Sequence, residues 1–122
     1  MTAPAPPSSL HLFAGLRVRD FDSARAWYER LLGEPTFLPH ATEAVWTLAD
    51  GRSIYVVEEA DRAGQGAVLV FVDDLDSHIA EIGSRGVEPH ASETYTNGVR
   101  KVVYRHPDGN EVAFGGAPVD TS

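Results

Sequence analysis

The sequence of 122 residues contains no cysteine, and this absence excludes several kinds of chemistry. Disulfide frameworks, thiolate metal sites and thiol nucleophiles are ruled out, so histidine, aspartate and glutamate are the ordinary metal ligands that remain. Long hydrophobic runs are also missing. The longest uninterrupted apolar stretch, 67–72, has six residues, whereas a membrane-spanning helix needs about 20. The sequence therefore predicts no membrane-spanning segment.

Basic residues are few as well. Ten lysines and arginines stand against eighteen acidic residues, which gives a formal net charge of −8. This surplus repels phosphate backbones and anionic membranes and favours neutral or cationic partners, so we expect no nucleic-acid partner and no membrane partner. The N-terminal segment 1–9, MTAPAPPSS, has no basic region and no apolar core. It is interpreted as a disordered leader and not as a signal peptide, and a cytoplasmic location is expected.

The remaining composition, with 43% hydrophobic and 23% charged residues, is typical of one soluble globular domain. An internal repeat shows how this domain is organised. VRDFDS at 18–23 recurs as VDDLDS at 72–77, and DGRSIYV at 50–56 is matched by DGNEVAF at 108–114. Two sequence motifs that recur in the same order predict two similar structural units. We place the domain at 10–115, with modules at about 10–60 and 66–115, and a C-terminal tail at 116–122.

Each module is predicted to fold in the order βαβββ. In the first module, 11–19 alternates with the period of two that is typical of a strand. Asp22 or Ser23 is the expected N-cap of a helix that ends at Gly33, and strands at 44–48 and 53–57 form a hairpin. The second module is predicted to repeat this order with a strand at 67–72, a helix at 76–85, and strands near 88–93, 98–105 and 110–114.

Three motifs carry a resemblance to a known family. They are LRVRDFDSARAWYERLLG at 16–33, VFVDDLDS at 70–77 and HPDGNEVAF at 106–114. The sequence resembles the vicinal oxygen chelate superfamily, which includes glyoxalase I, extradiol dioxygenases and bleomycin-resistance binding proteins. His106 stands where the family's last motif has an aspartate. The resemblance covers 10–115 and implies an α+β fold, in which two tandem βαβββ modules form a cup-shaped mixed β-sheet with the helices outside.

The same resemblance implies a metal in the cup, with ligands from the first and fourth strands of each module. Those four positions hold Phe13, Tyr55, Ala67 and Ala113, and none of them is a usual ligand of a divalent metal. His11 is an alternative ligand through a two-residue shift along the strand, but a lone histidine is a weak signal. We therefore expect no metal and no cofactor, and neither glyoxalase I nor ring-cleaving dioxygenase activity.

The other histidines show no spacing that would place two ligands on one strand or helix face. His78 lies one helical turn from Glu81, and we interpret the two as a solvated pair on an exposed helix face.

What remains is a cup with a mostly apolar lining and a few polar groups, which is typical of a small-molecule pocket. Alternation places residues of three strands on one face, and Trp46 and Tyr104 are added because planar ligands are often held between aromatic rings. The alternative is that these aromatic side chains fill the cup as ordinary core. The candidate ligand-binding residues are Phe13, Arg17, Trp46, Tyr55, Ala67, Leu69, Phe71, Tyr104 and Ala113.

Two classes of function compete. The first is a metal-independent protein that binds a small aromatic or amphipathic molecule, including cationic, antibiotic-like molecules, as in the drug-binding resistance proteins of the family. The second is a metal-free enzyme of the lyase or isomerase type, with Tyr55, Tyr104, Arg17 or a histidine as acid, base or oxyanion partner. We favour binding, because the sequence shows no pairing of a nucleophile with a base. A homodimer is also expected, because open strand edges and a half-formed cup are more stable when a partner covers them.

Overall fold

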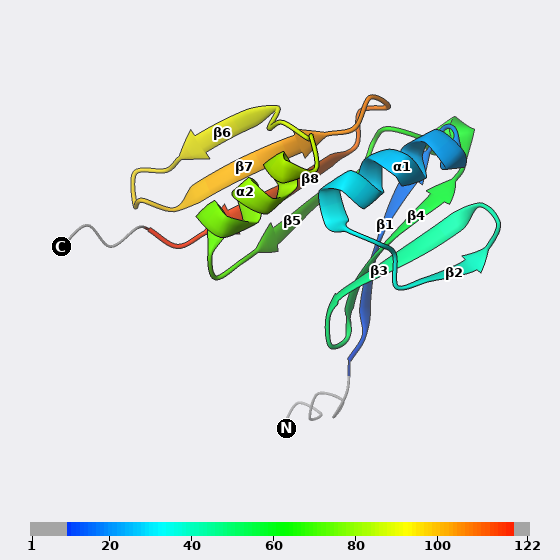
Figure 1. The fold of residues 1–122 in the computed structure, drawn as a ribbon, viewed down its shortest axis with the longest axis horizontal. Coiled ribbons are helices and arrows are strands. Elements are labelled where there is room, and N and C mark those ends of the chain that lie inside the picture. Colours follow the sequence, from blue (N-terminus) through cyan, green and yellow to red (C-terminus); the bar gives the residue numbers. More distant parts are fainter. Residues whose placement is uncertain (1–9, 119–122) are drawn as a thin grey trace, which may run out of the picture.

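The computed structural model describes residues 10–118, which form two α/β modules side by side (Figure 1). The expected leader at 1–9 lies outside the described residues, as does the part of the expected tail from 119 to 122. No helix within 10–118 is long and apolar enough to cross a membrane.

The first module contains a four-stranded mixed sheet in the order β1-β4-β3-β2, with β1 parallel to β4 and the other neighbours antiparallel. This is the predicted βαβββ order, and it includes a strand that the sequence pattern did not locate, β2. Its elements are β1 (Leu12–Val18), α1 (Phe21–Leu32), β2 (Phe37–His40), β3 (Glu43–Ala49) and β4 (Arg52–Glu58).

The second module repeats this topology with the strand order β5-β8-β7-β6. The parallel pair is now β5 with β8, and β8 pairs antiparallel with β7. The expected α+β fold of two tandem βαβββ modules is therefore confirmed. A short 3₁₀ turn, η1 (Ala60–Arg62), leads into elements β5 (Ala67–Phe71), α2 (Leu75–Ser84), β6 (Ala91–Thr94), β7 (Arg100–Arg105) and β8 (Glu111–Gly116).

Both helices begin earlier than the sequence predicted, because the aspartate at the third position of each repeated motif is the N-cap. The Asp20 side chain accepts a hydrogen bond from the Ser23 backbone N–H at 3.0 Å, and Asp74 accepts one from Ser77 at 3.1 Å. The expectation that Asp22 or Ser23 caps α1 is therefore wrong. Hydrogen bonds from the two serines lower the pKa of Asp20 and of Asp74, as expected of capping carboxylates.

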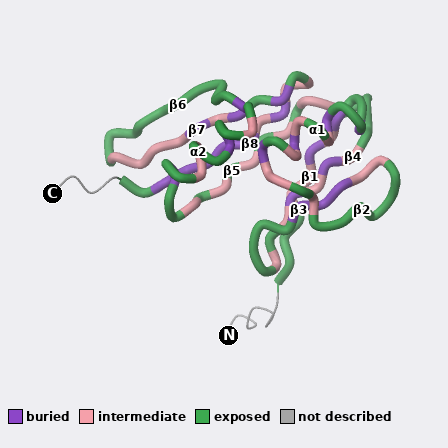
Figure 2. The backbone as a smooth tube through the Cα atoms, viewed as in Figure 1, coloured by how far each residue is buried: buried purple, intermediate pink, exposed green. Residues whose placement is uncertain are grey.

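The hydrophobic core lies between each sheet and its helix. The edge strands β2 and β6 are exposed throughout, whereas buried segments gather in the strands behind the helices (Figure 2). Each helix covers one face of its sheet. No helix within residues 10–118 covers the opposite face, and we call it the helix-free face. The largest fully buried side chains include Leu16, Phe21, Tyr28, Leu31, Trp46, Ile54, Ile82, Tyr104 and Phe114.

Two sets of contacts join the modules. On the helix side, Arg85 at the end of α2 donates hydrogen bonds to the carbonyls of Arg30 and Leu31 at 2.5 and 3.0 Å. These carbonyls belong to the last turn of α1, which has no intrahelical donors for them, so Arg85 caps the other module's helix. The two helices consequently lie next to each other on one side of the molecule (Figure 1).

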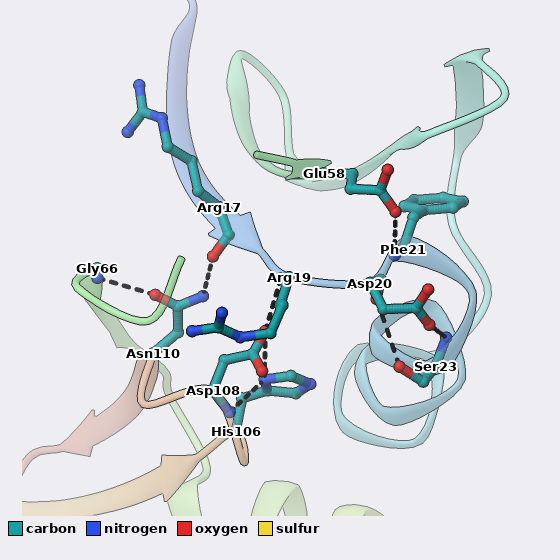
Figure 3. A network of polar contacts seen from close by, with 10 residues as sticks. All are labelled: Arg17, Arg19, Asp20, Phe21, Ser23, Glu58, Gly66, His106, Asp108 and Asn110. Atoms are coloured by element: carbon teal, nitrogen blue, oxygen red, sulfur yellow. Dashed lines mark hydrogen bonds and ion pairs between the residues drawn. The ribbon is translucent and has the colours of Figure 1, made fainter. Parts of the chain in front are cut away.

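The second set comes from the turn between β7 and β8, which carries the HPDGN sequence (Figure 3). The Asn110 side chain accepts a hydrogen bond from the Gly66 N–H at 2.8 Å and donates one to the Arg17 carbonyl at 2.7 Å. Asp108 accepts from the Arg19 N–H at 2.8 Å. The turn therefore fixes the backbone at the end of β1, and its contacts span 89 and 93 residues of chain.

His106, the departure from the family motif, is buried in the same junction. Its ring stacks on Tyr28 and meets the edge of Trp27, at centroid distances of 5.2 and 5.1 Å. The Nδ1 atom accepts a hydrogen bond from the Asp108 N–H at 3.1 Å. Burial lowers the pKa of His106, and the Asp108 carboxylate opposes this effect only in part, so the neutral ring is favoured.

Candidate ligand-binding site on the helix-free sheet faces

The helix-free face of the first module presents an aromatic side chain on each of two paired strands. Phe13 of β1 is 52% exposed, although it is a large apolar residue. Tyr55 of β4 stands directly opposite Gly15 of β1 in the strand register. A Cβ atom on Gly15 would overlap the Tyr55 ring and hydroxyl, so the glycine allows this ring to lie across the sheet.

The second module presents a similar surface with the strands exchanged. Leu69 and Phe71 of β5 are 60% and 59% exposed. Phe71 stands opposite Gly115 of β8, and a Cβ on that glycine would lie 3.0 Å from the ring. Each module therefore has an aromatic ring packed over a glycine on its helix-free face. Ala67 is exposed at the start of β5, and Ala113 is buried on β8 opposite Leu69.

Trp46 and Tyr104 lie on the opposite faces of their sheets, in the core beneath the helices. The Trp46 ring is buried 6.2 Å from the Tyr28 ring, and its Nε1–H donates to the Gly33 carbonyl at 2.8 Å. Tyr104 is fully buried 6.0 Å from Phe114, and burial raises its pKa. The expectation that these two residues line the cup is wrong, because the hairpin registers, which the sequence did not fix, turn them toward the helices.

The four family positions for metal ligands hold side chains that do not fit a divalent ion. Phe13, Ala67 and Ala113 have no donor atom, and Tyr55 leans over Gly15. Within residues 10–118 no group of three or more histidine, aspartate or glutamate side chains is arranged to hold a metal. His11, the alternative ligand, is an exposed side chain just before β1.

His78 does not form the solvated pair that the sequence suggested. Its ring packs 4.3 Å from the Phe114 ring, and its Nε2 atom is buried without a hydrogen-bond partner among residues 10–118. Glu81 instead pairs with Arg85 at 3.2 Å. Burial of the imidazole lowers the pKa of His78.

Two cavities lie along the free edges of β1 and β5. The larger one, of about 590 Å³, lies between the modules and includes Leu69 and Phe71 with apolar residues of β1. The smaller one, of about 290 Å³, lies beside Gly15 and Arg17. Its other lining residues, Arg62, Gln65 and Gly66, were missed from the sequence because the linker has no periodic pattern. Phe13 and Tyr55 line neither of them, so within residues 10–118 neither of these two cavities brings all the candidate residues together.

The chain matches the family model of the Glyoxalase/Bleomycin resistance protein/Dioxygenase superfamily over residues 9–114. It therefore belongs to this family, and the resemblance seen in its motifs is confirmed. A comparison with curated protein sequences gives no match.

Solved structures share the fold over nearly the whole chain. A glyoxalase/bleomycin resistance protein from Catenulispora acidiphila DSM 44928 is 55% identical, with a TM-score of 0.87 over 90% of this chain and 100% of that chain. A bleomycin-binding protein complexed with bleomycin is 24% identical, with a TM-score of 0.70 over 88% and 98%. A lactoylglutathione lyase from Agrobacterium tumefaciens is 23% identical, with a TM-score of 0.68 over 91% and 95%. The last two show likeness of fold alone.

Proposed function

We propose that this protein binds a small aromatic or amphipathic molecule on its helix-free sheet faces and does so without a metal. The observation that carries the proposal is the exposure of Phe13, Leu69 and Phe71 on faces that no helix covers. Exposed apolar side chains gathered on one surface mark a binding site for a ligand or a partner. The binding of bleomycin by a protein of the same fold supports a ligand of this class.

The complete cup is proposed to form between two copies of the chain. Within residues 10–118, the cavity between the modules includes Leu69 and Phe71 but neither Phe13 nor Tyr55, so it does not join the aromatic surfaces of the two sheets. A two-fold dimer that places the first module of one copy opposite the second module of the other gives two equivalent cups. Each cup then contains Phe13 and Tyr55 from one chain and Leu69 and Phe71 from its partner.

A thermal-shift screen that includes bleomycin and other cationic antibiotics tests ligand binding without assuming a reaction. A ligand at a hundredfold excess over its Kd is expected to raise the free energy of unfolding by about 2.7 kcal/mol. Phe13→Glu should abolish the shift, whereas Tyr95→Glu, at an exposed aromatic residue beyond β6, should retain it. Unchanged affinity in Phe13→Glu would show that the ligand binds elsewhere.

Dimerisation is tested by sedimentation at decreasing protein concentration. If each cup is shared, dilution below the dimer dissociation constant weakens ligand affinity and lowers the melting temperature together. A monomer at micromolar concentration with undiminished affinity would contradict the shared cup.

The alternative proposal is that the protein is a metal-free enzyme acting on a small metabolite. Its fold is shared with an enzyme, a lactoylglutathione lyase, which supports this alternative. Arg17 and Tyr55 are two polar residues on the helix-free face that could take part in such a reaction. Ligand-dependent turnover in metal-free buffer would establish this alternative over simple binding.

A further inference from the structure

The polar cavity beside β1 differs from the apolar surface around it. Gly15 and Arg17 form one wall, and the linker residues Arg62, Gln65 and Gly66 form the other. Two of these lining residues are arginines and none is acidic. A cavity with such walls attracts negative charge.

A single carboxylate orients both arginines. The Arg17 Nε atom lies 2.8 Å from one oxygen of Glu59, and the Arg62 Nε atom lies 3.5 Å from the other. Two positive groups and one negative group leave a net positive charge at this point. Both contacts with Glu59 are made through Nε, so they do not use the terminal amino groups of the two guanidiniums. Exposed ion pairs contribute little to stability, so the effect of Glu59 is chiefly to orient these donors.

The backbone that carries Arg17 is held by the rest of the molecule. Its carbonyl accepts hydrogen bonds from the Asn110 side chain at 2.7 Å and from the Gly64 N–H at 3.3 Å. In Figure 3 the Arg17 guanidinium points away from Asn110, on the far side of this anchored backbone. The base of the side chain is thus fixed before a ligand arrives, which reduces the entropy lost on binding.

An aromatic surface adjoins the cavity. The Tyr55 ring and hydroxyl lie over Gly15, which is itself part of the cavity wall. Phe13 lies two residues along the same strand, on the same face. A ligand with one group bound between the arginines could therefore place an adjoining ring on the aromatic surface of β1 and β4.

We infer that this cavity is a subsite for an oxyanion, such as a carboxylate or sulfonate, carried by a planar aromatic ligand. A guanidinium binds such groups through paired N–H donors. The inference rests on the proposed ligand-binding function and adds the sign of the ligand's charge. The net charge of −8 belongs to the whole chain, whereas Arg17 and Arg62 set the charge within this cavity.

The test uses two fluorescent probes with the same aromatic skeleton. 8-Anilinonaphthalene-1-sulfonate carries a sulfonate, and N-phenyl-1-naphthylamine is its uncharged counterpart. The ratio of their dissociation constants, measured at low salt, isolates the contribution of the anionic group. A hydrogen bond to a charged group corresponds to a preference of about tenfold or more for the sulfonate.

Arg17→Gln and Arg62→Gln should each reduce this preference, and the double variant should abolish it. Arg30→Gln is the matched control, because Arg30 is exposed in the last turn of α1, on the helix side. It should retain the preference of the unmodified protein. Circular dichroism and sedimentation of each variant verify its fold and assembly.

The subsite and the proposed function fail in different ways. If the uncharged probe binds in a manner that depends on Phe13 but the sulfonate confers no preference, the subsite is wrong and the ligand-binding function stands. A preference that survives in the double variant, or that is lost only because the variant changes its oligomeric state, also overturns the subsite. If neither probe binds the unmodified protein, the ligand-binding proposal is contradicted and the subsite with it.

Discussion

Replacement of Asn110 with alanine should lower the free energy of unfolding, because it removes two hydrogen bonds that join the modules. The side chain is 1% exposed and bridges the modules, with the Gly66 N–H on one side and the Arg17 carbonyl on the other (Figure 3). Alanine removes both hydrogen bonds and leaves a small polar-walled gap. The size of the loss in stability depends on whether each former partner of Asn110 keeps another hydrogen bond.

The Arg17 carbonyl retains the bond from the Gly64 N–H at 3.3 Å. The loss on that side is therefore close to the net value of one hydrogen bond, about 1 kcal/mol. The Gly66 N–H loses its acceptor, and an unpaired buried donor costs about 1–3 kcal/mol. Since Gly66 is only half-buried, the lower part of that range applies. The expected total is about 2–3 kcal/mol, a large share of the roughly 5–15 kcal/mol that holds a typical domain folded.

Urea denaturation followed by circular dichroism, at fixed pH and protein concentration, measures this loss. Asn97→Ala is the matched control, because the Asn97 side chain is exposed and accepts a local hydrogen bond from the Val99 N–H, two residues along the chain. That variant should lose less than about 1 kcal/mol. If Asn110→Ala costs no more than Asn97→Ala, the bridging role assigned to Asn110 is wrong.

Three further predictions concern the site and the junction. Gly15→Ala should displace the Tyr55 ring and weaken ligand affinity, whereas Gly83→Ala, where a Cβ meets nothing within 4 Å, should leave affinity unchanged in the same thermal-shift assay. Elemental analysis of purified protein should find no stoichiometric zinc, nickel, iron or manganese, and a chelator should not change the melting temperature; about one metal per chain would contradict this. Because burial lowers the pKa of His106 and of His78 in the folded state, the unfolded chain binds more protons just below pH 6.5. The free energy of unfolding should therefore fall as pH is lowered through that value, and His106→Gln should flatten the dependence measured by denaturation at several pH values.

Several features of the fold could be predicted because they depend on local pattern. The βαβββ order followed from the repeated motifs, and alternation placed Phe13 and Tyr55 on one face, as the register of β1 with β4 shows. A period of two is a property of the extended backbone itself. The role of these residues in ligand binding stays a prediction.

Other features could not be predicted, because they depend on pairing between strands. Trp46 and Tyr104 each sit in a hairpin strand whose register with its neighbour decides which side chains face the helix. A shift of one residue reverses every side chain. The short strand β2 has four exposed residues, and its pairing with β3, not its own pattern, makes it a strand.

The sequence by itself determined that this chain contains two similar modules, and it showed that the family's metal-ligand positions hold residues such as Phe13 and Ala113. The tertiary structure decided how the modules meet. Asn110 contacts Arg17 across 93 residues and Arg85 caps a helix 54 and 55 residues away. Local periodicity sets helices, strands and their faces, because neighbouring residues share one backbone geometry. Contacts between distant segments arise only when those segments pack, so the junction, the direction of the helix-free faces and the arginine-lined cavity required the folded chain.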